Sequence, residues 1–432
     1  MCLRKAPTSM NFTEMNPEQL KAARSAVEAE YNEFKAKGLD LNMARGKPTP
    51  EQILTGAGIL DVLTSHSDFT SEEGFDLLNY GCLTGLSECR RLLADVYGVP
   101  ADKIIVGNNS SLTMMFDYLM QCYAKGASEE TEPWVLQGDC KFLAVTPGYD
   151  RHFGITEYLG LEMINVPMTP EGPDMDVVEE LVKDPSVKGM FCVPQYSNPT
   201  GNTYSDETVK RLASMETAPD FRIIWDNAYA VHDLTGRKER VLDMLTECEK
   251  AGHPERVVMF GSTSKISIPG AGIAFLAANE PNYSWIIKRL SKQSIGADKL
   301  NQMRHVLYFK DKDGLMAHME EHASFTTPRF NIVTETFEKK LAGTGIASWT
   351  NPDGGYFISL DCMKGTASRV YELCAEAGVT LTPVGATFPH KDDPDDTNIR
   401  IAPTFPTEED LQQATDILVL SVKLAALEKL MA

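Results

Sequence analysis

Residues 257–272 read VVMFGSTSKISIPGAG, and this stretch decides the interpretation of the whole chain. The apolar run 257–260 predicts a buried strand, which places residues 262–265 in a turn at the carboxyl end of that strand. Lys265 can be shielded from water there, and a desolvated amine is a good nucleophile. Taken alone, the segment leaves open a solvated lysine in a serine-rich surface turn.

The sequence around this stretch alternates between short apolar runs and helical segments. Further apolar runs occupy residues 103–107, 142–145, 163–166, 190–193 and 222–225. Helical patterns occupy residues 87–97, 112–123, 174–183 and 206–215. This alternation predicts an α/β fold with a mostly parallel sheet covered by helices on both faces. Ligands of such sheets bind beyond the carboxyl ends of the strands.

The two ends of the chain add a second unit. Asn16-Pro17 opens a helix, with Gln19 at the capping-box position. Beyond residue 320, another α/β segment carries NPDGGYFISLD, a helix around Tyr371, NIRIAPTF and an amphipathic helix from Glu408. We therefore expect a large domain over residues 65–315 and a smaller α/β domain built from residues 1–64 and 316–432.

Composition and charge narrow the class of protein. The 432 residues include 61 acidic and 41 basic side chains, for a formal charge of −20, which argues against nucleic acid or an anionic membrane as partner. No apolar run is long enough to span a membrane, and the N-terminal residues lack the apolar core of a secretory signal. Nine scattered cysteines without a CxxC pair predict reduced thiols and no metal site. We expect a cytoplasmic enzyme.

Two further segments place polar groups at strand ends. In FRIIWDNAYA, residues 221–230, an apolar strand runs into Asp226, and Tyr229 follows three residues later. A buried carboxylate needs a partner such as a protonated ring nitrogen, although capping of the next helix explains it equally well. In YSNPTGNTYSDE, residues 196–207, a turn would present the amide of Asn198 at the sheet edge.

A fourth segment, IIVGNNSSLTMM, predicts a strand followed by a helix that begins near Ser110 or Ser111. Free backbone N–H groups, two hydroxyls and the helix dipole form an anion site suited to a phosphate, although a plain serine N-cap explains the segment as well. Together the four segments offer what pyridoxal 5′-phosphate requires. They supply a nucleophilic lysine, a carboxylate for the ring nitrogen, an amide and a phenol for the ring hydroxyl, and a phosphate site.

Over essentially its whole length the chain resembles the class I aminotransferases, which are pyridoxal-phosphate enzymes of fold type I. The S-x-S-K segment of that family corresponds to residues 262–265, its N-P-T-G turn to 198–201 and its D-x-x-Y element to 226–229. The segments ARGKP, DKLNQMRH and PGAGIAF are similar to a divergent aspartate aminotransferase branch.

The resemblance implies a role for each matching residue. Lys265 would bind the cofactor and move the proton at the substrate Cα, Asp226 would keep the ring nitrogen protonated, and Asn198 and Tyr229 would bind the ring oxygen. The implied phosphate ligands are Asn109, Ser110, Ser111 and Ser262.

The resemblance also extends to residues outside these motifs. Tyr149 would stack on the cofactor, and His152 would support Asp226. Tyr80 resembles a tyrosine that reaches the phosphate of the neighbouring subunit, which implies a homodimer with shared sites. Arg400 would bind the substrate α-carboxylate, and Gly46 belongs to a segment that closes over the substrate.

The chain departs from the family in one segment. The family usually has a phosphate-binding arginine shortly after the lysine, whereas the corresponding residues here, PGAGIAF, include no arginine. A dicarboxylic substrate needs a second cation, for which Lys292, Lys299 and Arg304 are candidates, and we assign Lys299. The implied activity is ping-pong transfer of an amino group, from aspartate to 2-oxoglutarate. Open alternatives are another amino acid (alanine, aminoadipate or an aromatic one), lyase or decarboxylase chemistry, and a cofactor-binding regulator.

Overall fold

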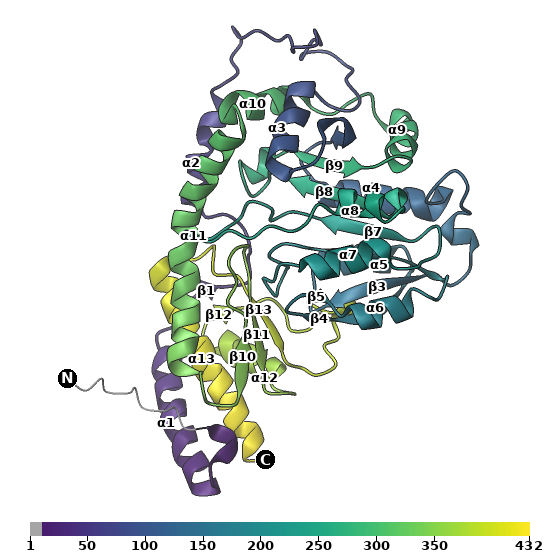
Figure 1. Ribbon diagram of the computed structural model, residues 1–432. Coiled ribbons are helices and arrows are strands. Elements are labelled where there is room, and N and C mark those ends of the chain that lie inside the picture. The colour runs from purple at the N-terminus through teal and green to yellow at the C-terminus, as the bar shows by residue number, and fades with distance from the viewer. Residues whose placement is uncertain (1–10) are drawn as a thin grey trace, which may run out of the picture.

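The computed structural model describes residues 11–432 (Figure 1). The first ten residues, which bear on the expectation about a secretory signal, lie outside this range. The predicted α/β fold is confirmed: a large sheet with helices on both faces lies beside a smaller sheet with its own helices.

The large sheet has eight strands in the order β2-β9-β8-β7-β6-β3-β4-β5. Along the chain these strands are β2 (Ile104–Val106), β3 (Lys141–Thr146), β4 (Glu162–Thr169), β5 (Gly172–Pro173), β6 (Val187–Cys192), β7 (Arg222–Asp226), β8 (Val257–Ser262) and β9 (Ala274–Ala278). Strands β4, β3, β6, β7 and β8 are parallel, whereas β9 is antiparallel to both β8 and β2. Because β9 runs antiparallel to both of its neighbours, β2 and β8 run in the same direction, and their carboxyl ends lie at the same edge of the sheet.

Both faces of this sheet are buried. Successive residues of β7 illustrate the pattern, since Ile223 and Trp225 pack into one core and Ile224 into the core on the other face. The surrounding helices are α3 (Ser87–Tyr97), α4 (Ser111–Lys125), α5 (Asp150–Tyr158), α6 (Met175–Leu181), α7 (Asp206–Ser214), α8 (Met244–Lys250), α9 (Asn282–Gln293) and α10 (Lys299–Phe309). Burial on both sides explains why the strands read as continuous apolar runs without polar alternation.

The second core joins both ends of the chain. Its antiparallel sheet consists of β10 (Ala347–Trp349), β11 (Ile358–Cys362) and β13 (Asn398–Ile401), and β1 (Leu41–Asn42) pairs in parallel with β12 (Val379–Thr380). The helices that contribute to this core are α1 (Pro17–Lys35), α11 (Lys312–Lys340), α12 (Ala367–Glu376) and α13 (Glu408–Leu430), and the short α2 (Pro50–Thr55) packs against α11. Short 3-10 turns lie at Phe12–Glu14, Ala57–Leu60, Ala101–Lys103, Trp134–Leu136, Pro254–Arg256, Pro269–Ala271 and Pro389–Lys391.

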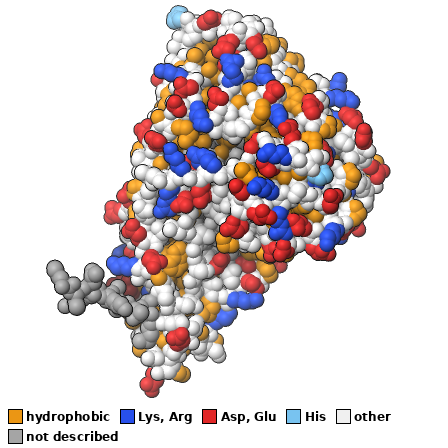
Figure 2. Space-filling model, in the orientation of Figure 1, with side chains coloured by type: hydrophobic (Ala, Val, Ile, Leu, Met, Phe, Trp, Pro, Cys, Tyr) orange, Lys and Arg blue, Asp and Glu red, His pale blue; other side chains and the backbone are white. Residues whose placement is uncertain are grey.

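Helix α11 is 29 residues long and runs beside both units, from α10 at one end to α13 at the other (Figure 1). The predicted capping box of α1 is present, with Asn16 and Gln19 bonded reciprocally. No helix within residues 11–432 is long and apolar enough to cross a membrane. On the face shown in Figure 2, acidic and basic side chains are interspersed.

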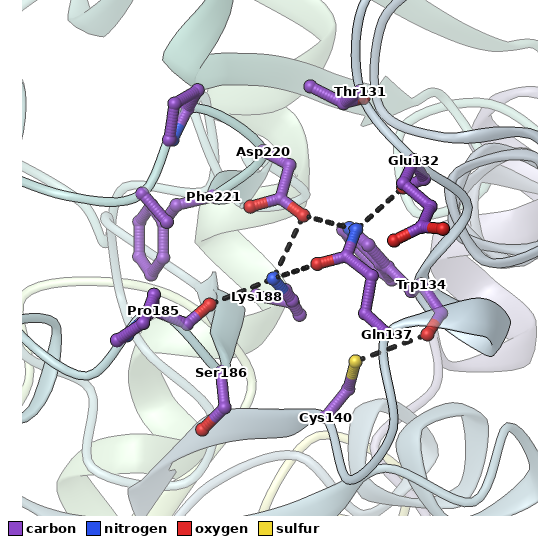
Figure 3. A network of polar contacts seen from close by, with 12 residues as sticks. Thr131, Glu132, Trp134, Gln137, Cys140, Pro185, Ser186, Lys188, Asp220 and Phe221 are labelled. Carbon is purple, nitrogen blue, oxygen red and sulfur yellow. Dashed lines mark hydrogen bonds and ion pairs between the residues drawn. The ribbon is translucent and has the colours of Figure 1, made fainter.

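A buried polar network ties together the ends of two strands of the large sheet (Figure 3). The ammonium of Lys188 on β6 lies 2.9 Å from Asp220 Oδ2, just before β7, and donates to Gln137 Oε1 at 2.7 Å. Gln137 in turn donates its Nε2 to Asp220 Oδ2 at 2.9 Å. These groups lie at the amino ends of the strands, opposite the edge where the predicted site residues lie.

Candidate active site

Lys265 lies in a tight turn directly after β8, as predicted. Thr263 N donates to Ile273 O at 2.8 Å, and Ile266 N donates to Thr263 O at 2.9 Å. The Lys265 ammonium lies 5.1 Å from the centre of the Tyr229 ring. A cavity of about 280 Å³ opens around this lysine, lined by Asn109, Ser110, Ser111, Leu112, Ala228, Ser262, Ser264, Lys265 and Pro269.

Asp226 is the last residue of β7 and is buried, next to β8 in the sheet. Its Oδ2 lies 2.9 Å from Nε2 of the buried His152, so the contact implied by the resemblance is present. The His152 ring stacks on Phe191 with the ring centres 4.2 Å apart. Asp226 Oδ1 is buried and has no hydrogen-bond partner among the described residues. Such an oxygen is costly unless a donor reaches it, and the protonated ring nitrogen of pyridoxal 5′-phosphate is a donor of that kind.

The start of α4 and the lysine turn lie side by side. Ser110 caps the helix, and its Oγ accepts from Thr113 N at 3.2 Å. Ser262 Oγ donates to Ser264 Oγ at 2.9 Å, and Ser264 Oγ donates to Asn109 O at 3.0 Å. The free N–H groups of a helix N-terminus and a cluster of hydroxyls fit a phosphate.

No arginine contributes to the cavity lining in the part of the chain that the structure describes. Where the family has its phosphate arginine nearby, this chain has the PGAGIAF segment, and a Cβ on Gly272 would lie 2.8 Å from the backbone of Ser264. The segment therefore packs directly against the lysine turn. Ser111, the first residue of α4, also lines the cavity, so hydroxyls and backbone N–H groups are the donors that this chain offers.

Two aromatic side chains and one amide lie close to this site without lining the Lys265 cavity: the Tyr229 ring lies beside Lys265, and Tyr149 and Asn198 line a separate, smaller cavity together with His152. Tyr149 precedes α5, and burial raises its pKa to about 12. Burial likewise raises the pKa of Tyr229. Both phenols are therefore protonated donors at neutral pH. The predicted turn at Asn198 is present, and Asn198 Oδ1 accepts from Arg400 Nη1 at 3.3 Å.

Arg400 reaches the site from β13 of the small sheet. Its Nη1 lies 3.1 Å from Asp150 Oδ1, and its guanidinium lies 4.9 Å from the ring centre of Phe357. Its Nε is buried and has no partner within residues 11–432. Gly46 approaches the same ring so closely that a Cβ there would overlap Phe357. A planar cation with an unused N–H fits a carboxylate.

Tyr80 and Lys299 do not join this cluster within the chain. Tyr80 is 85% exposed. Lys299, the first residue of α10, is buried and donates to the backbone carbonyls of Asn79 and Gly81. Its ammonium thus holds the loop on both sides of Tyr80, and it does not line the Lys265 cavity. Lys292 is exposed and Arg304 half-buried.

Sequence reasoning missed four residues that the structure places at the site. Ser264 could have been found as the second serine of the lysine segment, because a hydroxyl one residue before Lys265 faces the same turn. Asp150, His232 and Tyr356 carry no local signal. Their positions at Arg400 Nη1 and at the carbonyl of Lys265 depend on contacts between distant parts of the chain.

A second cavity, of about 350 Å³, lies between α4 and α9. It shares Asn109 and Ser110 with the first cavity but does not include Lys265.

The fold and the site together define a class of protein. A lysine in the turn after one strand, an aspartate at the end of the next and a helix N-terminus at the same edge form the arrangement of the pyridoxal-phosphate enzymes of fold type I. The donor set fits that cofactor at the ring nitrogen, the ring oxygen and the phosphate. The cofactor of this protein is accordingly pyridoxal 5′-phosphate.

Comparisons with known proteins identify the family. Residues 15–432 match the family model described as aspartate amino-transferase. The chain is 45% identical over 422 residues to an aspartate aminotransferase of Corynebacterium glutamicum, covering 98% of each protein. The crystal structure of an aspartate transaminase from the same organism superposes with a TM-score of 0.95 at 44% identity, covering 98% of this chain and 100% of that one.

A more distant structure shows the same fold. The α-aminoadipate aminotransferase of Thermus thermophilus, solved with N-(5'-phosphopyridoxyl)-L-leucine, has a TM-score of 0.72 at 20% identity, over 95% of this chain and 98% of that one. The present chain belongs to the aspartate amino-transferase family and is an aminotransferase.

Proposed function

We propose that this aminotransferase takes the amino group of L-aspartate and delivers it to a second 2-oxo acid, 2-oxoglutarate. The observation that carries the choice of aspartate is the 45% identity, over 98% of both chains, with a protein named aspartate aminotransferase. The unpaired Nε of Arg400 supports recognition of the α-carboxylate.

Lys265, Asp226 and Tyr229 are the proposed catalytic residues. Bound pyridoxal phosphate supplies an electron sink for the bonds at the substrate Cα. Lys265 binds the cofactor and then carries the proton removed from the Cα. Asp226, oriented by His152 at 2.9 Å, keeps the ring nitrogen protonated. The buried Tyr229 phenol, protonated at neutral pH, donates to the ring oxygen.

The remaining residues bind and orient. Asn198 would bind the ring oxygen and, next to Arg400 Nη1 at 3.3 Å, the substrate, while Tyr149 would pack against the ring. Gly46 belongs to the segment that closes over the substrate next to Phe357. The proposed phosphate ligands are Asn109, Ser110, Ser111 and Ser262, and Ser264 joins them because its hydroxyl lies 2.9 Å from that of Ser262.

The reaction proceeds in two halves at one site. Aspartate gives up its amino group and leaves as a 2-oxo acid, and 2-oxoglutarate then enters and leaves as an amino acid. Lys265 moves the Cα proton in both directions, so the same residue serves as base and as acid.

We also propose a homodimer whose sites are shared. The exposed Tyr80 would bind the phosphate in the partner subunit, and Lys299 would act by holding the carbonyls on either side of Tyr80. This replaces direct binding of a distal carboxylate by Lys299, because its ammonium already has carbonyl partners. The proposed domains remain residues 65–315 for the large one, and 1–64 with 316–432 for the small one. The acidic charge and the scattered cysteines favour a cytoplasmic location.

The test is the absorbance spectrum of the purified protein before and after addition of L-aspartate without an acceptor. We expect a visible band of lysine-bound cofactor that aspartate abolishes, and that is absent from Lys265→Ala. A band that responds only to alanine, aminoadipate or an aromatic amino acid would refute the choice of aspartate. Release of ammonia or carbon dioxide would indicate a lyase or a decarboxylase instead.

A further inference from the structure

Three buried histidines from different parts of the chain contact the turn that carries Lys265. His232 follows β7, and its Nε2 lies 3.3 Å from the backbone oxygen of Lys265. His318 on α11 lies 2.8 Å from the oxygen of Ile266, and His305 on α10 lies 2.8 Å from Ser267 Oγ. The main chain and hydroxyls of the turn are thus held from three sides.

The contact made by His232 fixes its protonation state. A carbonyl only accepts hydrogen bonds, so Nε2 of His232 must carry the proton that it shares with Lys265 O. Its Nδ1 is buried and meets no partner among the described residues. Burial, and then the charge of Lys265, lower the pKa of His232 to about 3. His232 is therefore a neutral donor with a single bonded N–H.

The ring of His232 is itself held in place. Its backbone N–H donates to Tyr229 O at 3.0 Å, and its backbone oxygen accepts from Gly355 N at 2.9 Å. The Tyr356 ring lies edge-on to it, with the ring centres 5.6 Å apart. Tyr356 Oη lies 3.5 Å from the oxygen of Lys265, at the limit of a hydrogen bond. The donor to Lys265 O is thus anchored both to the Tyr229 segment and to the loop before β11.

We propose that His232 is a positioning residue of the transamination reaction, which holds the backbone carbonyl of Lys265 so that the lysine amine stays over the Tyr229 ring. The lysine side chain has four rotatable bonds, so the position of its amine depends on where its main chain is fixed. His232 is not itself part of the cavity lining, and its polar side-chain contact with the site is the one to Lys265 O; its ring also lies edge-on to that of Tyr229, with the ring centres 5.6 Å apart. The inference rests on Lys265 being the cofactor lysine.

Four variants test this role. His232→Leu removes the donor. Glutamine places its amide nitrogen near the position of Nε2, so His232→Gln keeps a donor facing Lys265 O. Asparagine places its amide nitrogen near the position of Nδ1, so His232→Asn moves the donor away from that oxygen. The matched control is His322→Leu, because His322 is equally buried on α11 but contacts Thr55 and His318 and not the lysine turn.

The first readout needs no substrate: it is the pH midpoint of the visible band in each cofactor-loaded variant. We expect His232→Leu and His232→Asn to shift this midpoint by about half a pH unit or more, and His232→Gln and His322→Leu to leave it in place. The second readout is the steady-state rate with aspartate. We expect kcat to fall about tenfold in His232→Leu and His232→Asn, with KM changed less than about twofold.

Each other outcome overturns the inference. If His232→Leu matches His322→Leu in midpoint and in kcat, the contact with Lys265 has no positioning role. If His232→Leu does not fold, the pair of amide variants decides, and equal behaviour of glutamine and asparagine refutes the proposal. Absence of any visible band in the unaltered protein would instead refute the assignment of Lys265 and the proposed function with it.

Discussion

Replacing Lys188 by methionine tests the buried network at the amino ends of β6 and β7 (Figure 3). The side chains of Lys188 and Asp220 are only 3% and 8% exposed, and their charged atoms lie 2.9 Å apart. Lys188 also donates to Pro185 O at 2.8 Å and to Gln137 at 2.7 Å. Methionine has a similar length but no charge, so within residues 11–432 the variant leaves the Asp220 carboxylate buried with only the amide of Gln137 as donor.

The expected cost follows from this burial. Removing one partner of a buried ion pair destabilises a protein by about 3–5 kcal/mol, because the remaining charge stays desolvated. The matched control is Lys141→Met. Lys141 lies 2.8 Å from Asp184, but these side chains are 28% and 41% exposed. An exposed pair contributes about 1 kcal/mol or less, so the two substitutions should differ by at least about 2 kcal/mol in free energy of unfolding.

The assay is urea unfolding of both cofactor-loaded variants, at one protein concentration and with the intrinsic fluorescence as signal. We expect a clearly lower midpoint for Lys188→Met alone, and partial recovery when Asp220→Leu is added, because the unpaired charge is then gone. Activity per folded molecule should be unchanged, since the network lies at the edge of the sheet opposite Lys265. Equal midpoints for the two single variants would refute the reasoning, and would mean that Asp220 finds water or a proton when Lys188 is removed.

Three further predictions concern the site and its surroundings. Arg400→Lys should raise the KM for aspartate about thirtyfold, equivalent to about 2 kcal/mol, because lysine cannot bind a carboxylate in the bidentate manner; a KM within threefold of the original in steady-state kinetics would contradict this role. Lys299→Met should weaken pyridoxal-phosphate binding about tenfold by releasing the loop around Tyr80, whereas the exposed Lys292→Met should not, and equilibrium titration of the apoprotein compares the two. Burial lowers the pKa of His305 to about 4 from an ordinary value of 6.5. As the pH falls below 6.5, the imidazole is therefore protonated in the unfolded chain but stays neutral in the folded protein, so the free energy of unfolding falls between pH 6.5 and pH 4. This one group should cost about 2 kcal/mol at pH 5, and urea midpoints at pH 7.5 and pH 5 should move less in His305→Gln than in the original protein.

The sequence predicted a helix or strand correctly where the apolar spacing and the capping residues of that one segment were sufficient to identify it. The helix predicted over residues 87–97 is α3 (Ser87–Tyr97), and the last helix begins at Glu408 as expected. Strand β9 was missed although AFLAA is an apolar run like those of the other strands, because only the short turn Pro269–Ala271, and no α-helix, separates it from β8, so it falls outside the expected alternation of strands and helices. Its assignment requires knowing that it lies between β8 and β2 in the sheet, and that pairing is not encoded locally.

The candidate site likewise contains residues that the local sequence predicts and residues whose role depends on contacts between distant parts of the chain. Lys265, Asp226 and the start of α4 were predictable, because parallel strands bring their carboxyl ends to one edge wherever they lie in the sequence. The donor to the backbone of Lys265 was not, because His232 is a lone histidine until the fold places it under the turn. Lys299 was assigned by its position in the family pattern, whereas the structure places its ammonium on two carbonyls.

The proposed role of Arg400 explains why one site would need both sheets. Lys265 and Asp226 follow adjacent strands of the large sheet, whereas Arg400 lies on β13 of the small one and reaches back to Asp150 at 3.1 Å and Asn198 at 3.3 Å. Its buried Nε has no hydrogen-bond partner within residues 11–432. A substrate whose amino group lies at Lys265 and whose carboxylate lies at Arg400 bonds to both sheets at once. Binding of such a substrate therefore favours the arrangement of the two sheets in which Lys265 and Arg400 are separated by the distance between its amino group and its carboxylate. An amine without a carboxylate does not bond to Arg400 and would not favour that arrangement.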